Sequence, residues 1–203
     1  MSVDIAKKIE AHRRLVSGIC CPERKVDPEN LKSVLNLAME IAREGREGRK
    51  IGTMFVISDT DSTLMRSRPM ILDPLYGHPD ALKRVDDPGM RETVKELAML
   101  DGAFIVSDGG VVLSACRYID ATSEGLELPL GLGSRHMAAA SITRTTNSVA
   151  IVVSESSMVR VFDNGAIVGE IIPELWMLRQ YGAQFNDHLV SEAITEEEVI
   201  TRN

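Results

Sequence analysis

Apolar residues at helical spacing predict the first well-defined element of the chain. From residue 28 to residue 44 they recur every three or four positions, so one face of a helix is apolar. Asp27 is suited to cap this helix, Pro28 fits its first position, and Gly45 is a natural end. Residues 3–16 carry a looser amphipathic pattern, which predicts a further helix nearer the N-terminus.

Two more helices are expected later in the chain. Residues 91–100 place Val94, Leu97 and Met99 toward a sheet. Residues 135–146 should form the other helix, and their small side chains permit close packing on a sheet. Both helices therefore have an apolar or small face that can cover strands.

Short apolar runs predict the strands. Residues 54–57 have the pattern of a buried strand. Residues 149–153 have that of a central strand covered on both faces, because their apolar run shows no alternation. Two hairpins are expected around turn-forming residues. They pair residues 104–107 with 111–114, and residues 158–162 with 166–168.

These elements predict one α/β domain with a central mixed β-sheet flanked by helices. Hairpins supply antiparallel neighbours, and helical crossovers supply parallel ones. Residues 66–90 carry four prolines and two glycines, which predicts mostly loop. We expect an N-terminal helical extension over residues 1–50, the domain over residues 51–172, and a C-terminal helix with an acidic tail over residues 173–203.

Composition narrows the class of protein. The 203 residues are 44% hydrophobic and 26% charged, as in an ordinary globular protein. The net charge of −7 argues against binding to nucleic acid or to an anionic membrane, which both favour a basic surface. No apolar run is long enough to span a bilayer, and the N-terminus lacks the features of a signal peptide. Because the three cysteines form no metal or redox motif, we expect a cytoplasmic protein.

Asp101-Gly102-Ala103 is the first candidate for chemistry. It follows a predicted helix and opens an apolar strand, where a carboxylate can hold a metal or take a proton. Gly102 allows the backbone to approach a ligand closely. Because Asp-Gly is also common in turns, the motif alone does not identify a site.

Ser134-Arg135-His136 precedes and opens a predicted helix, where free backbone N–H groups favour an anion. Ser134 can cap the helix, Arg135 offers a fork for phosphate oxygens, and His136 adds a donor whose charge depends on pH. The three together favour a phosphate site over a solvated helix cap. Ser154-Glu155 places a hydroxyl and a carboxylate at the end of the long apolar strand, at another expected sheet edge.

Residues 59–63 suggest an alternative class of enzyme. Their Asp-x-Asp-x-Thr pattern after a strand resembles the first motif of haloacid-dehalogenase-type phosphatases, whose first Asp is the nucleophile. Ser107, also after a strand, would stand for that family's second motif. No later strand ends in an Asp pair for Mg²⁺, since Asp86 and Asp87 lie in the proline-rich loop. A solvated Asx turn at Asp59 is the favoured interpretation.

Taken in order, the motifs resemble those of the nucleotidyl-cyclase domain of DisA-type diadenylate cyclases. That family carries Asp-Gly-Ala, matched by residues 101–103, and Gly-Thr-Arg-His-Arg, matched by residues 133–137 with Ser for Thr and Met for the second Arg. Residues 116–119 look like the family's Tyr-Leu pair beside adenine. Residues 151–155 look like its strand followed by Ser-Glu. The resemblance covers roughly residues 51–170, so it spans a whole domain.

The resemblance implies an enzyme that condenses two ATP into cyclic di-AMP and two pyrophosphates across a face-to-face homodimer. ATP is then the substrate, and Mg²⁺ or Mn²⁺ is the cofactor. The implied metal ligands are Asp101 and Glu155, and the implied catalytic residues are Asp101, Arg135 and His136. By the same resemblance, Gly102 and Ala103 form the floor of the site and Tyr118 and Ile119 flank adenine. The implied phosphate contacts are Ser134, Arg135, His136 and Ser154, with Glu155 completing the nucleotide site.

Met137 is the main departure from the family pattern, because it removes a cation that the family carries. Arg144, two helical turns further on, or a partner subunit would have to supply the missing charge. The alternative is a catalytically weakened module that binds ATP or cyclic di-AMP as a sensor. The haloacid-dehalogenase-like phosphatase is a more remote alternative.

Overall fold

The computed structural model describes residues 26–122, 124–126 and 128–173, together with Arg14, residues 17–21 and Arg24. The helices are α2 (Pro28–Glu44), α3 (Thr60–Met65), the 3-10 helix η1 (Asp80–Leu82), α4 (Pro88–Leu97) and α5 (Ser134–Thr145). The strands are β1 (Thr53–Ile57), β2 (Ser67–Pro69), β3 (Ala103–Val106), β4 (Val112–Ile119), β5 (Val149–Val153), β6 (Val159–Asp163) and β7 (Ala166–Ile171).

The strands form one seven-stranded sheet in the order β2-β4-β3-β1-β5-β6-β7. β1 pairs in parallel with β3, and all other neighbours in this sheet are antiparallel. The predicted α/β fold with a mixed sheet is therefore confirmed. β1 and β5 lie near the middle of the sheet, and every residue of both strands is buried, as their uninterrupted apolar runs predict.

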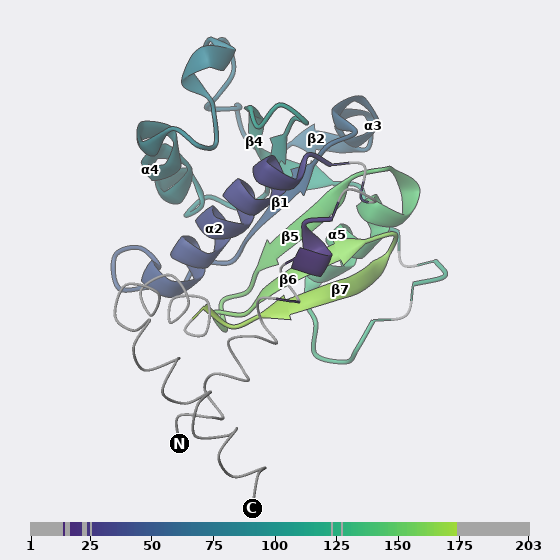
Figure 1. Ribbon diagram of the computed structural model, residues 1–203. Helices are drawn as coiled ribbons and strands as arrows, with labels where there is room; N and C mark the ends of the chain where they lie inside the picture. Colours follow the sequence, from purple (N-terminus) through teal and green to yellow (C-terminus); the bar gives the residue numbers. More distant parts are fainter. Residues whose placement is uncertain are drawn as a thin grey trace, which may run out of the picture.

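Two apolar layers cover the two faces of the sheet. On one face of the sheet, α2 and α4 pack over buried strand residues such as Phe55 and Ile151. On the other, the small face of α5 packs over Val56 and Val152. Figure 1 shows the long α2 lying across the sheet, with α5 behind it and α4 beside α2. In the part of the chain that the structure describes, no helix combines the length and apolarity needed to cross a bilayer.

Local capping explains where α2 and α4 begin. Asp27 accepts hydrogen bonds from the backbone of Glu29 and Asn30, and α2 begins at Pro28 as predicted. α4 begins three residues before the predicted start, because Asp87 caps it and Pro88 occupies its first position. The prediction that Met99 faces the sheet is wrong, since α4 ends at Leu97 and the side chain of Met99 is exposed.

Some observed elements were not predicted, and two predicted ones lie outside the described residues. α3 is short and polar, β2 lies in the segment predicted to be mostly loop, and β4 continues to Ile119, well past the predicted end of its strand. The predicted N-terminal helix over residues 3–16 and the C-terminal helix fall almost wholly outside the residues that the structure describes. The predicted segment boundaries at residues 50 and 172 stay a prediction, and α2 shares its core with the sheet.

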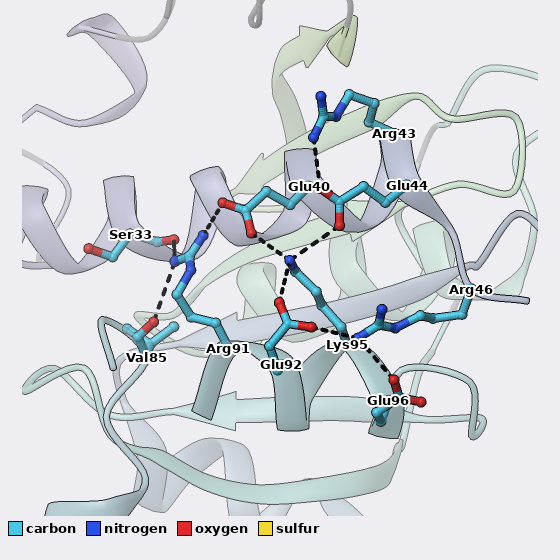
Figure 2. Close-up of polar contacts among 10 residues, drawn as sticks. All are labelled: Ser33, Glu40, Arg43, Glu44, Arg46, Val85, Arg91, Glu92, Lys95 and Glu96. Carbon is cyan, nitrogen blue, oxygen red and sulfur yellow. Dashed lines mark hydrogen bonds and ion pairs between the residues drawn. The ribbon is translucent and has the colours of Figure 1, made fainter. Parts of the chain in front are cut away.

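An ion-pair network ties α2 to α4 (Figure 2). Lys95 Nζ lies 3.0 Å from Glu40 Oε2, 3.2 Å from Glu44 Oε2 and 2.8 Å from Glu92 Oε1. Arg91 adds a second contact to Glu40 at 2.5 Å. The Lys95 side chain is only 10% exposed, so three carboxylates converge on a cation that water scarcely reaches.

We expect Lys95→Met to lower the free energy of unfolding by about 2 kcal/mol. The substitution keeps most of the apolar stem but removes the cation that Glu40, Glu44 and Glu92 share. Each carboxylate keeps an arginine partner at its outer side, and solvent screens part of the remaining repulsion. Urea denaturation measures the effect. Lys32→Met is the matched control, because Lys32 is exposed and its ion pair within the described residues is with Glu29, at 3.5 Å. Equal loss in the two variants would contradict a stabilising role for the network.

Candidate active site

A pocket of about 220 Å³ lies between the sheet and the N-terminal end of α5. Four elements build it, since β1, the start of β3, the end of β4 and the first turns of α5 meet at this point. Its lining residues are Met54, Met70, Asp101, Gly102, Ala103, Arg117, Tyr118, Ile119, Ala121, Ser134, Arg135, Met137 and Ala138. The fold thus brings both ends of the stretch 101–136 to one cavity.

The pocket has an apolar half and a charged half. Met54, Met70 and Ile119 contribute to the apolar half. Tyr118 is 44% exposed, and the guanidinium of Arg68 lies 4.4 Å from the centre of its ring. An apolar recess with an aromatic ring fits a planar base better than a phosphate.

Gly102 has a backbone reason to be glycine. Its φ is +109°, and a Cβ there would stand 2.7 Å from the carbonyl carbon of Cys116 and 2.8 Å from the backbone nitrogen of Arg117. Cys116 itself has a positive φ of 54°, where the pairing of β3 with β4 shifts register. Gly102 therefore packs closely on the neighbouring strand and forms part of the floor of the pocket, and its expected close approach to a ligand stays a prediction.

Arg135 organises the charged half. Its Nη2 lies 2.8 Å from Asp101 Oδ1 and its Nη1 lies 3.8 Å from Glu155 Oε1. A Cβ at Gly52 would stand 2.8 Å from Arg135 Nη1, so the absence of a side chain there leaves room for the guanidinium. Both carboxylates are largely exposed, at 65% for Asp101 and 73% for Glu155, and remain open to a ligand.

The N-terminus of α5 opens beside this cluster. The prediction that Ser134 caps the helix is wrong, because Gly133 occupies the cap position and Ser134 is the first helical residue. Among the described residues no side chain caps α5, so its first N–H groups keep their capacity to bind an anion. Ser134 lines the pocket in the same place.

His136 is a predicted site residue that does not line the pocket, although its neighbours Arg135 and Met137 do. It is 7% exposed, its ring centre lies 6.1 Å from that of Phe162, and its Nε2 lies 3.2 Å from Arg160 Nη1. Burial lowers the pKa of His136 below its ordinary value of 6.5. Arg160 and Arg135 lower it further, while the charge of Glu170 acts in the opposite direction. Its predicted contact with phosphate stays a prediction.

The lowered pKa of His136 predicts a pH-dependent stability. Between its folded pKa and 6.5 the unfolded chain binds more protons than the folded one, so the free energy of unfolding falls as pH falls through this window. Carboxylates such as Glu92 contribute only at lower pH, because their pKa is also lowered from an ordinary value of 4.5. Urea unfolding between about pH 7 and pH 5 should show the slope. His136→Gln should flatten it, and an unchanged slope would contradict the assignment.

Ser154 and Glu155 directly follow the end of β5, as predicted. Ser154 Oγ lies 2.9 Å from Ser156 Oγ within the turn, and neither Ser154 nor Glu155 lines the pocket directly. Glu155 reaches the site through Arg135 alone among the described residues. Glu155 therefore contacts the charged half of the pocket through Arg135, whereas Ser154 is adjacent to Glu155 in sequence and has no contact with the pocket lining among those described.

The donor set near Arg135 fits a divalent metal only in part. No group of three or more His, Cys, Asp or Glu side chains in the described residues could hold an ion without other ligands. Asp101 and Glu155 converge on one guanidinium and can supply two carboxylates. Mg²⁺ is commonly bound by one or two carboxylates together with substrate phosphates and water, so the pair fits such an ion once a nucleotide supplies the remaining oxygens.

The residues of the phosphatase alternative have structural roles. Asp59 adopts a left-handed conformation at the start of α3 and accepts a hydrogen bond of 2.8 Å from the backbone of Asn147, which lowers its pKa. Asp87 caps α4, and Asp86 pairs with Arg84 at 2.9 Å. These contacts favour the interpretation of Asp59 as a turn residue.

Two positions at the site were not predicted. Met70, which lines the pocket, comes from the proline-rich loop, and Gly52, which lies against the Arg135 side chain, precedes β1, where the sequence shows no motif. Arg117 also lines the pocket. Its charge and its position next to Tyr118, near the end of β4, could have indicated a site residue. Arg144 lies away from the pocket, in a surface hollow where Nη1 donates to the carbonyl of Gly125.

Known proteins match both the sequence and the fold. The family described as DisA bacterial checkpoint controller nucleotide-binding, or DAC, matches residues 40–167. A relative named diadenylate cyclase from Methanocaldococcus jannaschii is 47% identical over 144 residues, which are 70% of this chain and 45% of that protein. Another of the same name from Haloferax volcanii is 36% identical over 176 residues, 85% of this chain and 64% of that protein.

A solved structure supports the fold alone. It is described as a hypothetical membrane spanning protein from Bacillus cereus, and it matches with a TM-score of 0.53 and 19% identity over 68% of this chain and 62% of that one. The chain spans less than two thirds of the length of either curated relative. The match to the family model covers well over half of the chain, and it includes the β-strands and the α5 turn that form the pocket. The chain belongs to the DisA nucleotide-binding (DAC) family.

Proposed function

We propose that this chain is a diadenylate cyclase, which condenses two ATP into cyclic di-AMP and releases two pyrophosphates. The observation that carries the proposal is the pocket itself, where Asp101 and Arg135 stand 2.8 Å apart beside an apolar recess. Such a site can hold a base at one end and a triphosphate at the other. The two curated relatives that carry this name support the same activity.

The pocket gives each part of ATP a place. Adenine lies in the apolar half against Tyr118 and Ile119. The triphosphate extends toward Ser134, Arg135 and the uncapped N-terminus of α5, where the helix dipole and free N–H groups favour its charge. Binding at both ends fixes the α-phosphate between them, and much of the rate acceleration then comes from alignment.

In each half-reaction, a 3′-hydroxyl oxygen of one ATP forms a bond to the α-phosphorus of the other. The bond from that phosphorus to the bridging oxygen of pyrophosphate breaks, and the hydroxyl proton leaves to solvent or to a nearby base. Asp101 and Glu155 would hold a Mg²⁺ or Mn²⁺ that accompanies ATP, and this ion would neutralise phosphate charge and lower the pKa of the attacking hydroxyl. Arg135 stabilises the charge that develops on the phosphate oxygens.

Arg135 has to change partners when substrate binds. Without nucleotide its guanidinium is held between Asp101 and Glu155. Phosphate oxygens compete for its fork, and the two carboxylates become available to the metal that accompanies ATP. The same three side chains therefore serve the empty and the loaded site.

Ring closure requires two sites that face each other, so the active species is at least a homodimer. Exposed apolar side chains next to the pocket support such a face. Ile71 and Leu72, which follow Met70, are 49% and 94% exposed, and Tyr76 is 88% exposed. A second copy that packs there would place its own nucleotide opposite the first.

Incubation of the purified chain with ATP and Mg²⁺ or Mn²⁺, followed by mass spectrometry, tests the proposal. Cyclic di-AMP and pyrophosphate are the expected products, and their absence with both metals would overturn it. Specific activity should also fall on dilution, because assembly of the site is second order in protomer. Activity that persists unchanged below the concentration where the protein becomes a monomer would contradict the two-site mechanism.

Met137 supports a second function, a sensor that binds ATP or cyclic di-AMP without turnover. It lines the pocket where the family carries an arginine, so this chain has one cation fewer in the charged half. Calorimetric binding of either nucleotide with no product would select this function. Met137→Arg would then be expected to restore turnover.

A further inference from the structure

His136, Arg160 and Glu170 form a chain of contacts from α5 to β6 and β7. His136 Nε2 lies 3.2 Å from Arg160 Nη1, and Arg160 Nε lies 2.5 Å from Glu170 Oε1. Arg160 and Glu170 stand opposite each other in the register of the two strands. The sheet therefore fixes the position from which Arg160 of β6 reaches the imidazole. β6 and α5 pack against each other, and Figure 1 shows both elements.

The direction of the contact defines the protonation of His136. A guanidinium has donors and no acceptor, so Arg160 donates and Nε2 must accept with its lone pair. A neutral ring that accepts at Nε2 carries its proton on Nδ1. Glu170 holds Arg160 by a charge-assisted hydrogen bond, with the Arg160 side chain only 16% exposed, and this limits the rotamers from which Arg160 could release the ring.

In this tautomer Nδ1 of His136 is a buried hydrogen-bond donor that has no acceptor among the described residues. The residue is 7% exposed, and Nδ1 has no hydrogen-bond partner among the described residues. A buried donor without a partner is unfavourable and is uncommon in native proteins. His136 directly follows Arg135 in the uncapped first turn of α5, where the proposed triphosphate would lie.

We propose that Arg160, oriented by Glu170, is a positioning residue that keeps His136 as the Nδ1–H tautomer, so that the ring donates to a phosphate oxygen of the bound nucleotide. The inference rests on the proposed function for the identity of the phosphate. The charged groups around the ring are Arg160 and Arg135, which both disfavour an imidazolium, and Glu170, which is already engaged by Arg160. These charges therefore favour a neutral His136 ring, which can still donate from Nδ1.

Long-range ¹H–¹⁵N spectra of the histidine side chains test the tautomer in the protein without ligand. His136→Gln assigns the His136 signals by their loss. The expected spectrum is that of a neutral ring protonated on Nδ1, which becomes perturbed at Nδ1 when inorganic triphosphate and Mg²⁺ are added. A ring protonated on Nε2 or on both nitrogens at neutral pH would overturn the proposal, and so would an Nδ1 signal that triphosphate leaves unchanged.

Substitution of Arg160 provides the second test. Arg160→Met should release the ring toward the Nε2–H tautomer and weaken binding of inorganic triphosphate about tenfold, the loss expected when one hydrogen bond to a charged group is removed. Arg160→Lys keeps a donor and should restore much of both signals. Arg43→Met is the matched control, because Arg43 is exposed and pairs with Glu44 at the surface of α2. Equal weakening in Arg160→Met and Arg43→Met, or an unchanged tautomer in Arg160→Met, would overturn the proposal.

These readouts separate the two proposals. The wild-type chain could make no cyclic di-AMP and still show the Nδ1–H tautomer and the triphosphate response. This result would contradict the cyclase function and support the role of Arg160. A chain that makes cyclic di-AMP with an Nε2–H ring would do the reverse. Glu170→Gln should show a smaller change in the same direction as Arg160→Met, since it weakens the hold on Arg160 without removing its donor.

Discussion

Asp101→Asn should lower the rate of cyclic di-AMP formation by about a thousandfold or more. The substitution removes the charge that pairs with Arg135 at 2.8 Å and one of the two carboxylates proposed for the metal. Loss of an electrostatic contact made at the reacting phosphate commonly costs 10² to 10³ in rate, on the order of a single oxyanion-hole donor, and loss of a metal ligand adds to it. Quantification of product by mass spectrometry measures the loss at saturating ATP.

The fold should survive this substitution. Asp101 Oδ1 accepts a hydrogen bond of 2.8 Å from the backbone of Gly102, and the amide oxygen of asparagine can accept the same bond. The thermal midpoint should therefore stay close to that of the wild type. Asp108→Asn is the control, because Asp108 is exposed in the β3–β4 turn and its side chain takes no part in the site. Retention of more than about a tenth of the activity in Asp101→Asn would contradict the assigned role.

Arg135→Met should reduce kcat/KM by about 10³. Arg135 is the guanidinium that lines the pocket between the two carboxylates, and arginines that stabilise phosphoryl-transfer transition states contribute about 10³ to 10⁵. Arg135→Lys should retain part of the activity, because it keeps the charge but loses the planar fork. Steady-state kinetics over a range of ATP concentrations measure both variants.

Arg144→Met provides the comparison for the charged half of the pocket. Arg144 is the other arginine of α5, and it donates to the Gly125 carbonyl away from the pocket. Its substitution should therefore change kcat/KM little. A loss as large as that of Arg135→Met would mean that Arg144 replaces the cation missing at Met137, and would contradict the arrangement described here.

The sequence predicts most of the fold wherever side-chain pattern and local capping agree. Asp27 and Pro28 define the start of α2, and the apolar run of β5 indicates a central strand. α3 escapes prediction because its six residues are mostly polar and its helix has no side-chain cap. β4 escapes in its second half because a bulge at Cys116 breaks the alternation of buried and exposed residues.

The site is predictable where it consists of contiguous motifs. Asp101 and Arg135 belong to recognisable segments, and the fold brings them to one pocket. Met70 and Gly52 are not recognisable, because only the packing of the sheet brings their segments to the cavity. His136 shows a different limit, since its motif predicts a phosphate contact but not the arginine of β6 that controls its tautomer.

The bulged pairing of β3 with β4 determines which parts of the pocket tolerate substitution. Its floor is main chain packed on main chain, with Gly102 in direct contact with the backbone of Cys116 and Arg117. Side chains that line the walls, such as Met137, can be exchanged without moving that floor. A side chain at Gly102 would instead collide with that backbone and force it to shift. Substitutions in the walls can therefore alter the chemistry of the pocket while its floor keeps its shape.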